Sequence, residues 1–136
     1  MIEQNYNHIQ KLICTAKTQY NRENENISLL AVSKKQPLTA IKEAYNLGQL
    51  DFGENFVQEG VEKIKELNNK NINWHFIGHI QSNKTRLISE NFDWVHTVDR
   101  IKIAERLSKQ RPDHADNLNI CIQINVDDEK TKSGVN

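Results

Sequence analysis

Cysteine, proline and glycine are scarce in this 136-residue chain, which contains two, two and five of them, respectively. Two cysteines, Cys14 and Cys121, are too few for a disulfide framework. Both lie in apolar patterns, so we expect both to be buried thiols. Gly53, Gly60 and Gly78 are isolated, whereas dinucleotide-binding and P-loop motifs need closely spaced glycines. The sequence therefore lacks both a disulfide scaffold and a glycine-rich phosphate loop.

Net charge and long hydrophobic runs are also absent. Eighteen Lys and Arg balance eighteen Asp and Glu, so the sequence lacks the basic character expected of a nucleic-acid-binding protein. No run approaches the roughly 18 apolar residues of a membrane-spanning helix. The first five residues, 1–5, do not resemble a secretory signal. We therefore expect a soluble cytoplasmic protein with no nucleic-acid or membrane partner.

What the chain does contain is an alternation of helical and strand patterns. Apolar residues recur at helical spacing in some segments, and short apolar runs separate them. The run at 27–32 is continuous enough for a strand buried on both faces. The expected helices are 2–20, 37–48, 56–67, 84–88 and 101–107, and the expected strands are 27–32, 50–53, 74–77, 94–98 and 119–126. Five such units predict one α/β domain with about five parallel strands and covering helices.

Polar residues follow every predicted strand, at the edge of a parallel sheet where functional groups gather. Lys34 is the strongest candidate because it directly follows a buried strand, and burial would lower its pKa. A lysine that is partly neutral is the nucleophile for a Schiff base with an aldehyde such as pyridoxal phosphate. A lysine that ends a strand is also a common solubilising feature, so spacing alone leaves both interpretations open.

Other candidate groups give weaker signals. His75 and His79 are four residues apart, but they lie on a strand and its following loop rather than on a helix, so we expect no metal site. Ser82 and Asn83 are placed to cap a helix N-terminus, which can bind an anion, although capping alone is the more common role. No arrangement of Ser, His and Asp, or of Cys and His, indicates a catalytic residue.

Several segments occur together in the order of a known family. They are Ala31-Val32-Ser33-Lys34-Lys35-Gln36-Pro37, Phe52-Gly53-Glu54-Asn55-Phe56-Val57-Gln58-Glu59, Trp74 through Lys84, His96-Thr97-Val98-Asp99-Arg100, and Gln123-Ile124-Asn125-Val126 with Lys132-Ser133-Gly134. From about residue 28 onward, the sequence resembles the YggS/PROSC pyridoxal phosphate homeostasis proteins, which are related to the N-terminal barrel of alanine racemase.

The resemblance implies a (β/α)8 TIM-type barrel that binds pyridoxal phosphate, with Lys34 as the Schiff-base lysine. It also implies that Asn55, His79 and Ser82 line the cofactor pocket. A complete barrel typically needs about 250 residues and rarely fewer than 200. We therefore expect residues 1–136 to form the N-terminal part of a single barrel domain. Such a partial barrel lacks the family's later phosphate-binding segment and leaves two sheet edges open, through which it could self-associate.

For the intact family, the implied role is intracellular pyridoxal phosphate homeostasis, in which the protein carries and buffers the cofactor and passes it to pyridoxal-phosphate-dependent apoenzymes. We expect a carrier rather than an enzyme, because racemisation needs an acid or base on each face of the substrate and no partner for Lys34 is evident. Two alternatives stay open. One is a racemase-like enzyme that acts on amino acids, and the other is an inert barrel fragment with no affinity for the cofactor.

Overall fold

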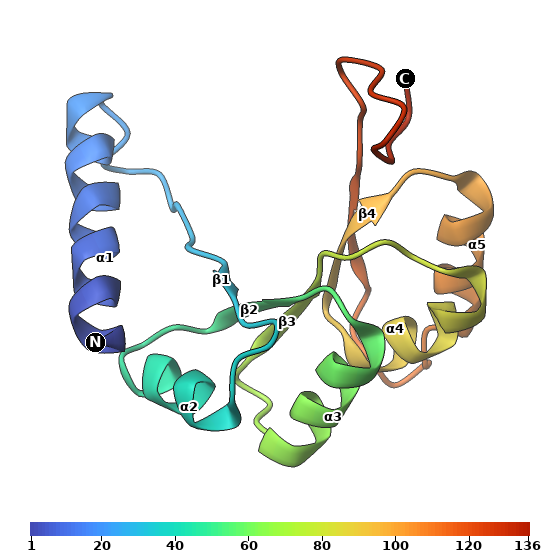
Figure 1. The fold of residues 1–136 in the computed structure, drawn as a ribbon, viewed down its shortest axis with the longest axis horizontal. Coiled ribbons are helices and arrows are strands. Elements are labelled where there is room, and N and C mark those ends of the chain that lie inside the picture. The colour runs from blue at the N-terminus through green and yellow to red at the C-terminus, as the bar shows by residue number, and fades with distance from the viewer.

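The computed structural model describes all 136 residues as alternating helices and strands (Figure 1). The helices are α1 (Ile2–Gln19), α2 (Leu38–Asn46), α3 (Val57–Leu67), α4 (Thr85–Asn91) and α5 (Ile101–Gln110), with a short 3₁₀ turn, η1 (Ser82–Lys84), before α4. The strands are β1 (Ala31–Val32), β2 (Asp51–Glu54), β3 (Asn73–Phe76), β4 (Trp94–Val98) and β5 (Asn119–Ile122). The predicted order of elements is confirmed, with boundaries that differ by a few residues.

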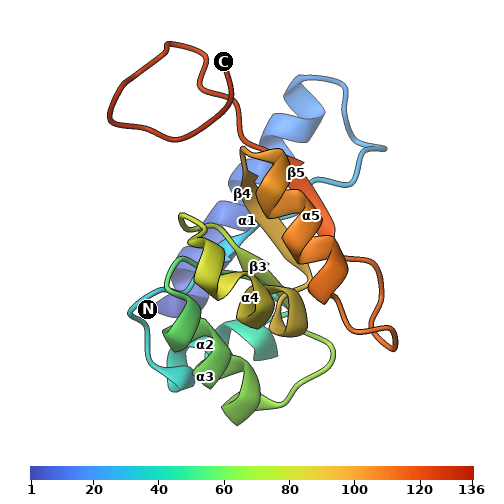
Figure 2. The ribbon, with the colours of Figure 1, turned by 90° about the vertical axis from the view of Figure 1, so that its right-hand side faces the viewer.

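The five strands form one parallel sheet in the order β1-β2-β3-β4-β5, so every strand lies beside its neighbour in the chain. Helices α2 to α5 cover one side of this curved sheet, and the other side is left open (Figure 1). Seen from the right-hand side of that view, α3, α4 and α5 lie side by side in front of the strands (Figure 2). This is the arrangement of a partial (β/α)8-type barrel, as predicted.

The hydrophobic core lies between the sheet and the helices that cover it. Alternate strand residues point to opposite faces, and Phe52, Trp74 and Phe76 all point toward the helices, where Phe76 meets Phe92 of the α4–β4 connection edge to face at 5.4 Å. Burying each side chain of this size stabilises the fold by about 1.5–3 kcal/mol. The core cluster comprises Ile41, Phe52, Val61, Ile72, Trp74, Phe76, Ile80, Ile88, Phe92, Val95, Val98, Ile103 and Leu107.

Helix α1 begins at the predicted residue and ends one residue earlier than predicted, but it buries none of its residues. It packs mainly against α2 and stands apart from the sheet (Figure 1). Cys14, on α1, is therefore exposed, and Cys121, on β5, is only half-buried. The prediction of two buried thiols is wrong, because an apolar pattern leads to burial only where another element covers that face. No helix of the chain is long and apolar enough to span a membrane.

The two outer strands are less buried than the sequence predicted. β1 consists of two residues only, and Ile27 and Val32 are 38% and 50% exposed. The prediction of a strand at 27–32 buried on both faces is wrong, because neither the outer edge of β1 nor its open face is covered. β5 forms the other edge of the sheet, where Ile120 and Ile122 are 45% and 67% exposed. Exposed apolar edges of this kind favour pairing with other chains.

We predict that the chain associates in a concentration-dependent manner through these edges. Replacing Ile122 by Lys should reduce association, because a charged side chain on an edge strand opposes edge-to-edge pairing. Light scattering over a range of protein concentrations measures this directly. A wild-type chain that stays monomeric at high concentration would contradict the prediction.

Candidate functional site

The carboxyl ends of the parallel strands bring the polar motif residues to one rim of the sheet. Adjacent strands stay bonded up to this rim, where Ser33 N donates to Gly53 O at 2.9 Å and Ile77 N donates to Glu54 O at 2.9 Å. The segments that follow β1, β2 and β3 are thus held next to one another. The predicted rim motifs from these three strands do converge in the fold.

Lys34 lies in a tight turn directly after β1. Gln36 N donates to Ser33 O at 3.0 Å and closes the turn. Lys35 has a φ of 59°, in the left-handed region that costs an ordinary residue about 1–2 kcal/mol. The Lys34 side chain is exposed and makes no hydrogen bond within the chain. The expected burial of this amine is wrong, because β1 ends before Lys34 and the turn carries it to the surface of the rim.

A buried network of charged groups lies against this turn. Lys63, on α3, is 7% exposed, and its Nζ donates to Ser33 O at 2.7 Å, to Glu54 Oε1 at 2.8 Å and to Glu59 Oε1 at 2.7 Å. Glu54 is fully buried, and its Oε1 also accepts a hydrogen bond from Ser33 Oγ at 2.6 Å. Glu59 Oε1 accepts from Lys35 N at 2.6 Å. The network therefore joins β1, β2 and α3 at the Lys34 turn.

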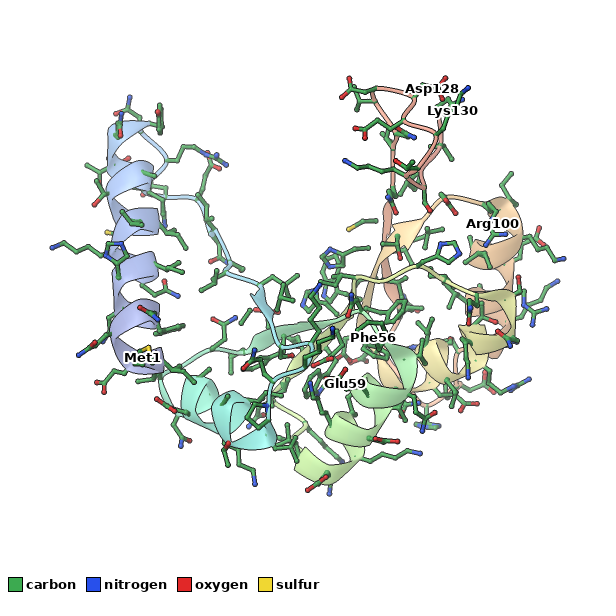
Figure 3. The ribbon with its side chains drawn as sticks, viewed as in Figure 1. Met1, Phe56, Glu59, Arg100, Asp128 and Lys130 are labelled. Carbon is green, nitrogen blue, oxygen red and sulfur yellow. The ribbon has the colours of Figure 1, made fainter.

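The network also determines the electrostatics of Glu59. The hydrogen bond from Lys63 lowers the pKa of the Glu59 carboxyl, burial opposes this, and the backbone N–H of Lys35 lowers the pKa further. Glu59 is therefore an anion at neutral pH. Figure 3 labels Glu59 at the start of α3, near the centre of that view.

A pocket of about 510 Å³ opens between the start of α3 and the loop after β3. Asn55 and His79, two of the predicted pocket residues, both line it, together with Lys84. Asn55 Oδ1 is buried and has no hydrogen-bond partner. Gln58, the neighbour of Glu59, also lines the pocket, so the start of α3 joins this pocket to the Lys34 turn. A second pocket, of about 350 Å³, lies at the opposite end of the strands and contains none of the predicted site residues.

The other predicted site residues are placed differently. Lys34 is not among the residues that line the 510 Å³ pocket, and neither is Ser82. Ser82 begins η1, where its carbonyl accepts a hydrogen bond from Thr85 Oγ1 at 3.0 Å. His79 is exposed, and its Nδ1 lies 3.5 Å from Ser133 Oγ, which brings two distant motifs together at the rim. The structure thus joins Asn55 and His79 in one pocket, and the Lys34 turn is hydrogen-bonded to the helix whose first residues line that pocket.

Gly78 allows the ends of β2 and β3 to approach closely. A Cβ atom at this position would lie 2.2 Å from the carbonyl oxygen of Asn55, which is backbone and has no free rotation to relieve the clash. The Gly78 carbonyl also accepts a hydrogen bond from Thr97 Oγ1 at 2.5 Å. Gly78, which lines the pocket, is therefore packed against the Asn55 backbone after β2 and bonded to the Thr97 side chain of β4.

A second polar cluster lies on the sheet face opposite the helices. His75 Nε2 is 2.9 Å from Asp51 Oδ1, its Nδ1 is 2.8 Å from His96 Nε2, and Trp94 stacks on its ring. Burial lowers the pKa of His96, and the nearby His75 lowers it further. With His75 Nε2–H donating to Asp51 and His96 Nε2–H donating to His75 Nδ1, every member has a partner. The cluster links β2, β3 and β4. It holds His75 on the open face of the sheet, whereas His79 lines the pocket at the rim.

No group of three or more His, Cys, Asp or Glu side chains is arranged to hold a metal ion.

The sequence patterns did not predict the whole rim network. The place of Glu54 at the rim follows from its position at a strand end, but the helical pattern predicts that Lys63 faces solvent. The one available signal was the spacing of Glu59 and Lys63, which are four apart on a helix and thus neighbours.

Comparisons with known proteins agree with the motifs. The chain is 55% identical over 136 residues to the pyridoxal phosphate homeostasis protein of Haemophilus influenzae and 52% identical over 137 residues to that of Escherichia coli K12. Each alignment covers 98% of this chain. The chain resembles the pyridoxal phosphate homeostasis proteins over almost its whole length. The chain spans 57% and 58% of the length of these two homeostasis proteins. No family model matches it.

Solved structures give the same result for the fold. PipY of Synechococcus elongatus without PLP has a TM-score of 0.75 and 41% identity, and the match covers 81% of this chain and 52% of PipY. PipY with PLP bound has a TM-score of 0.72 and 37% identity, covering 89% and 57%. An unknown protein from Bifidobacterium adolescentis has a TM-score of 0.88 and 27% identity, covering 99% and 59%. The resemblance drawn from the motifs is confirmed.

Replacing Gly78 by Ala should lower the free energy of unfolding by about 1–3 kcal/mol, because the added methyl group is forced against the Asn55 backbone. Gly53→Ala is the matched control. There the added Cβ meets the tip of the Ile77 side chain at 3.2 Å, which can move aside. Urea denaturation of both variants measures the difference. Equal stabilities would contradict the close approach at Gly78.

The lowered pKa of Glu59 predicts a specific pH dependence. A carboxyl whose pKa is lower in the folded than in the unfolded chain stabilises the fold above its ordinary pKa of 4.5, and this stability is lost as the pH falls through the folded-state pKa. Wild type should therefore have a higher Tm than Glu59→Gln at about pH 7, and the difference should shrink below about pH 4.5. A difference that is constant with pH would contradict this account.

Proposed function

We propose that this chain binds pyridoxal phosphate through a Schiff base on Lys34, and that the complete protein carries and buffers the cofactor inside the cell. The observation that carries the proposal is the position of Lys34. It presents an exposed primary amine on a turn that is held from both sides at the rim of a barrel-like sheet. PipY, which has this fold, has been solved with PLP bound, and the curated relatives are named for pyridoxal phosphate homeostasis.

The residues at the rim fit such a ligand. The buried Asn55 Oδ1 has no partner, and an unpaired buried acceptor costs free energy that a hydrogen bond from a ligand would recover. The adjoining pocket adds the polar side chains of His79, Gln81 and Lys84. This donor and acceptor set suits a polar, anionic ring compound, as pyridoxal phosphate is. Lys34 would hold it covalently, and Asn55 and His79 would line its site.

The chemistry of attachment is reversible. When bound, pyridoxal phosphate would supply an aldehyde, which the unprotonated amine of Lys34 would hold as a carbon–nitrogen double bond with release of one water. Because Lys34 is exposed in this chain, exchange of the cofactor here would require no opening of the fold. This supports a role as a carrier that releases pyridoxal phosphate to apoenzymes, rather than as an enzyme that retains it for turnover.

Titration with pyridoxal phosphate tests the proposal, with binding followed by equilibrium dialysis and by the absorption of the Schiff base. Lys34→Ala should weaken binding about tenfold or more, since the covalent bond is lost. Lys35→Ala is the matched control, because it removes the adjacent exposed lysine side chain and keeps the backbone N–H that bonds to Glu59.

Binding that is equal in the two variants, or absent from wild type, would contradict the proposal and would leave an inert barrel fragment as the better description. Incubation of the loaded chain with L-alanine tests the enzyme alternative. The carrier proposal predicts no conversion to D-alanine above that of free pyridoxal phosphate, and sustained racemisation would support a racemase-like enzyme.

A further inference from the structure

We propose that Lys63 is a positioning residue, which fixes the backbone on both sides of Lys34 through Glu54 and Glu59. This inference rests on the proposed function, because it assigns Lys63 to hold the lysine that would carry the cofactor. Lys63 itself does not reach the rim surface, since its side chain is 9% exposed. It acts through the residues that it contacts.

The first connection runs to the residue before Lys34. Lys63 Nζ binds the carbonyl oxygen of Ser33 at 2.7 Å and Glu54 Oε1 at 2.8 Å, and the same carboxylate oxygen accepts from Ser33 Oγ at 2.6 Å. Both the backbone and the side chain of Ser33 are therefore bound to one buried ion pair. Ser33 is 4% exposed, so water does not compete for these bonds.

The second connection runs to the residue after Lys34. Glu59 Oε1 lies 2.7 Å from Lys63 Nζ and accepts from Lys35 N at 2.6 Å. Lys35 adopts a φ of 59°, which an L-residue rarely takes without a compensating contact. The hydrogen bond to Glu59 is that contact. The turn is thus held at Ser33 and Lys35, and Lys34 between them keeps its side chain free.

The close packing of α3 on the sheet makes this geometry possible. A Cβ atom at Gly60 would lie 2.7 Å from the Phe92 ring and 3.2 Å from Glu54 Cβ, so α3 approaches β2 at this point. One turn later, Lys63 reaches Glu54. Buried ion pairs add little stability compared with apolar pairs of the same size. All three acceptors of Lys63 belong to the turn or to the residues that bind it, which indicates a role in geometry.

Amide hydrogen exchange at Lys35, measured by NMR without any cofactor, tests the inference. Glu59→Ala should speed this exchange roughly tenfold, the loss expected for one charge-assisted hydrogen bond. Glu59→Gln should restore much of the protection, because its amide oxygen can still accept. Glu62→Ala is the matched control on the same helix, since Glu62 is exposed and bonds only to Gln58. Lys63→Met should speed amide exchange at both Ser33 and Lys35.

The second measurement is the ratio of Lys34 to Lys35 labelling after pyridoxal phosphate and borohydride are added. This ratio should exceed that of the denatured chain in wild type and in Glu62→Ala, and it should fall toward the denatured value in Glu59→Ala. If Glu59 had only a structural role, Glu59→Ala would keep the wild-type labelling ratio at any temperature at which the fold persists. If Lys63→Met does not fold, the Glu59 variants decide the question.

The inference would be overturned if Glu59→Ala had the same exchange rate at Lys35 and the same labelling ratio as wild type. Failure of the proposed function has a different signature. In that case wild type itself would show no preference for Lys34, while the exchange at Lys35 would still report whether the network holds the turn.

Discussion

The contact on which the rim depends is the buried ammonium of Lys63. It binds two carboxylates and one carbonyl oxygen, and these groups come from β2, from α3 and from the residue that follows β1. Such a group is costly to bury unless it is fully paired. Because each acceptor has a second bond to the Lys34 turn or belongs to it, the pairing that stabilises Lys63 also determines the path of the chain at the site.

The two faces of the sheet serve different purposes. The face toward α2–α5 holds the aromatic core, which gives the strands a rigid support. The open face carries Asp51, His75 and His96, which are bonded to one another across three strands. The carboxyl ends of the strands lie together at the rim, between these two faces. A site built there is held by the core on one side and stays accessible to a small ligand.

Much of this architecture follows from the sequence. Apolar periodicity predicts α3 and α5, whose apolar stripes face the sheet, and the short runs at 74–77 and 94–98 predict strands that the structure has within a residue. The same reasoning fails where a partner element decides burial. The pattern around Cys14 is as helical and apolar as the others, yet no element covers that face of α1. The predicted length of the first strand is wrong for the same reason, since the length of β1 depends on its neighbours at the sheet edge.

The candidate site divides in a similar way. Lys34, Asn55 and His79 are strand-end residues in specific motifs, so sequence predicts their place at one rim. The exposure of Lys34 was not predicted, because the strand before it is itself exposed at the edge of the sheet and the turn after β1 carries Lys34 to the surface of the rim. Lys63 was missed because its partners, Ser33 and Glu54, are 30 and 9 residues away in the chain. Contacts of that kind are set by how α3 packs on the sheet, which local patterns do not specify.

The most direct test of the central claim is a peptide map of the chain after pyridoxal phosphate is added and reduced onto its lysines with borohydride. Our account predicts that the modified peptide is mainly the one containing Lys34, at an occupancy well above that of the denatured chain. Labelling spread evenly over the exposed lysines, or concentrated at another lysine, would contradict it.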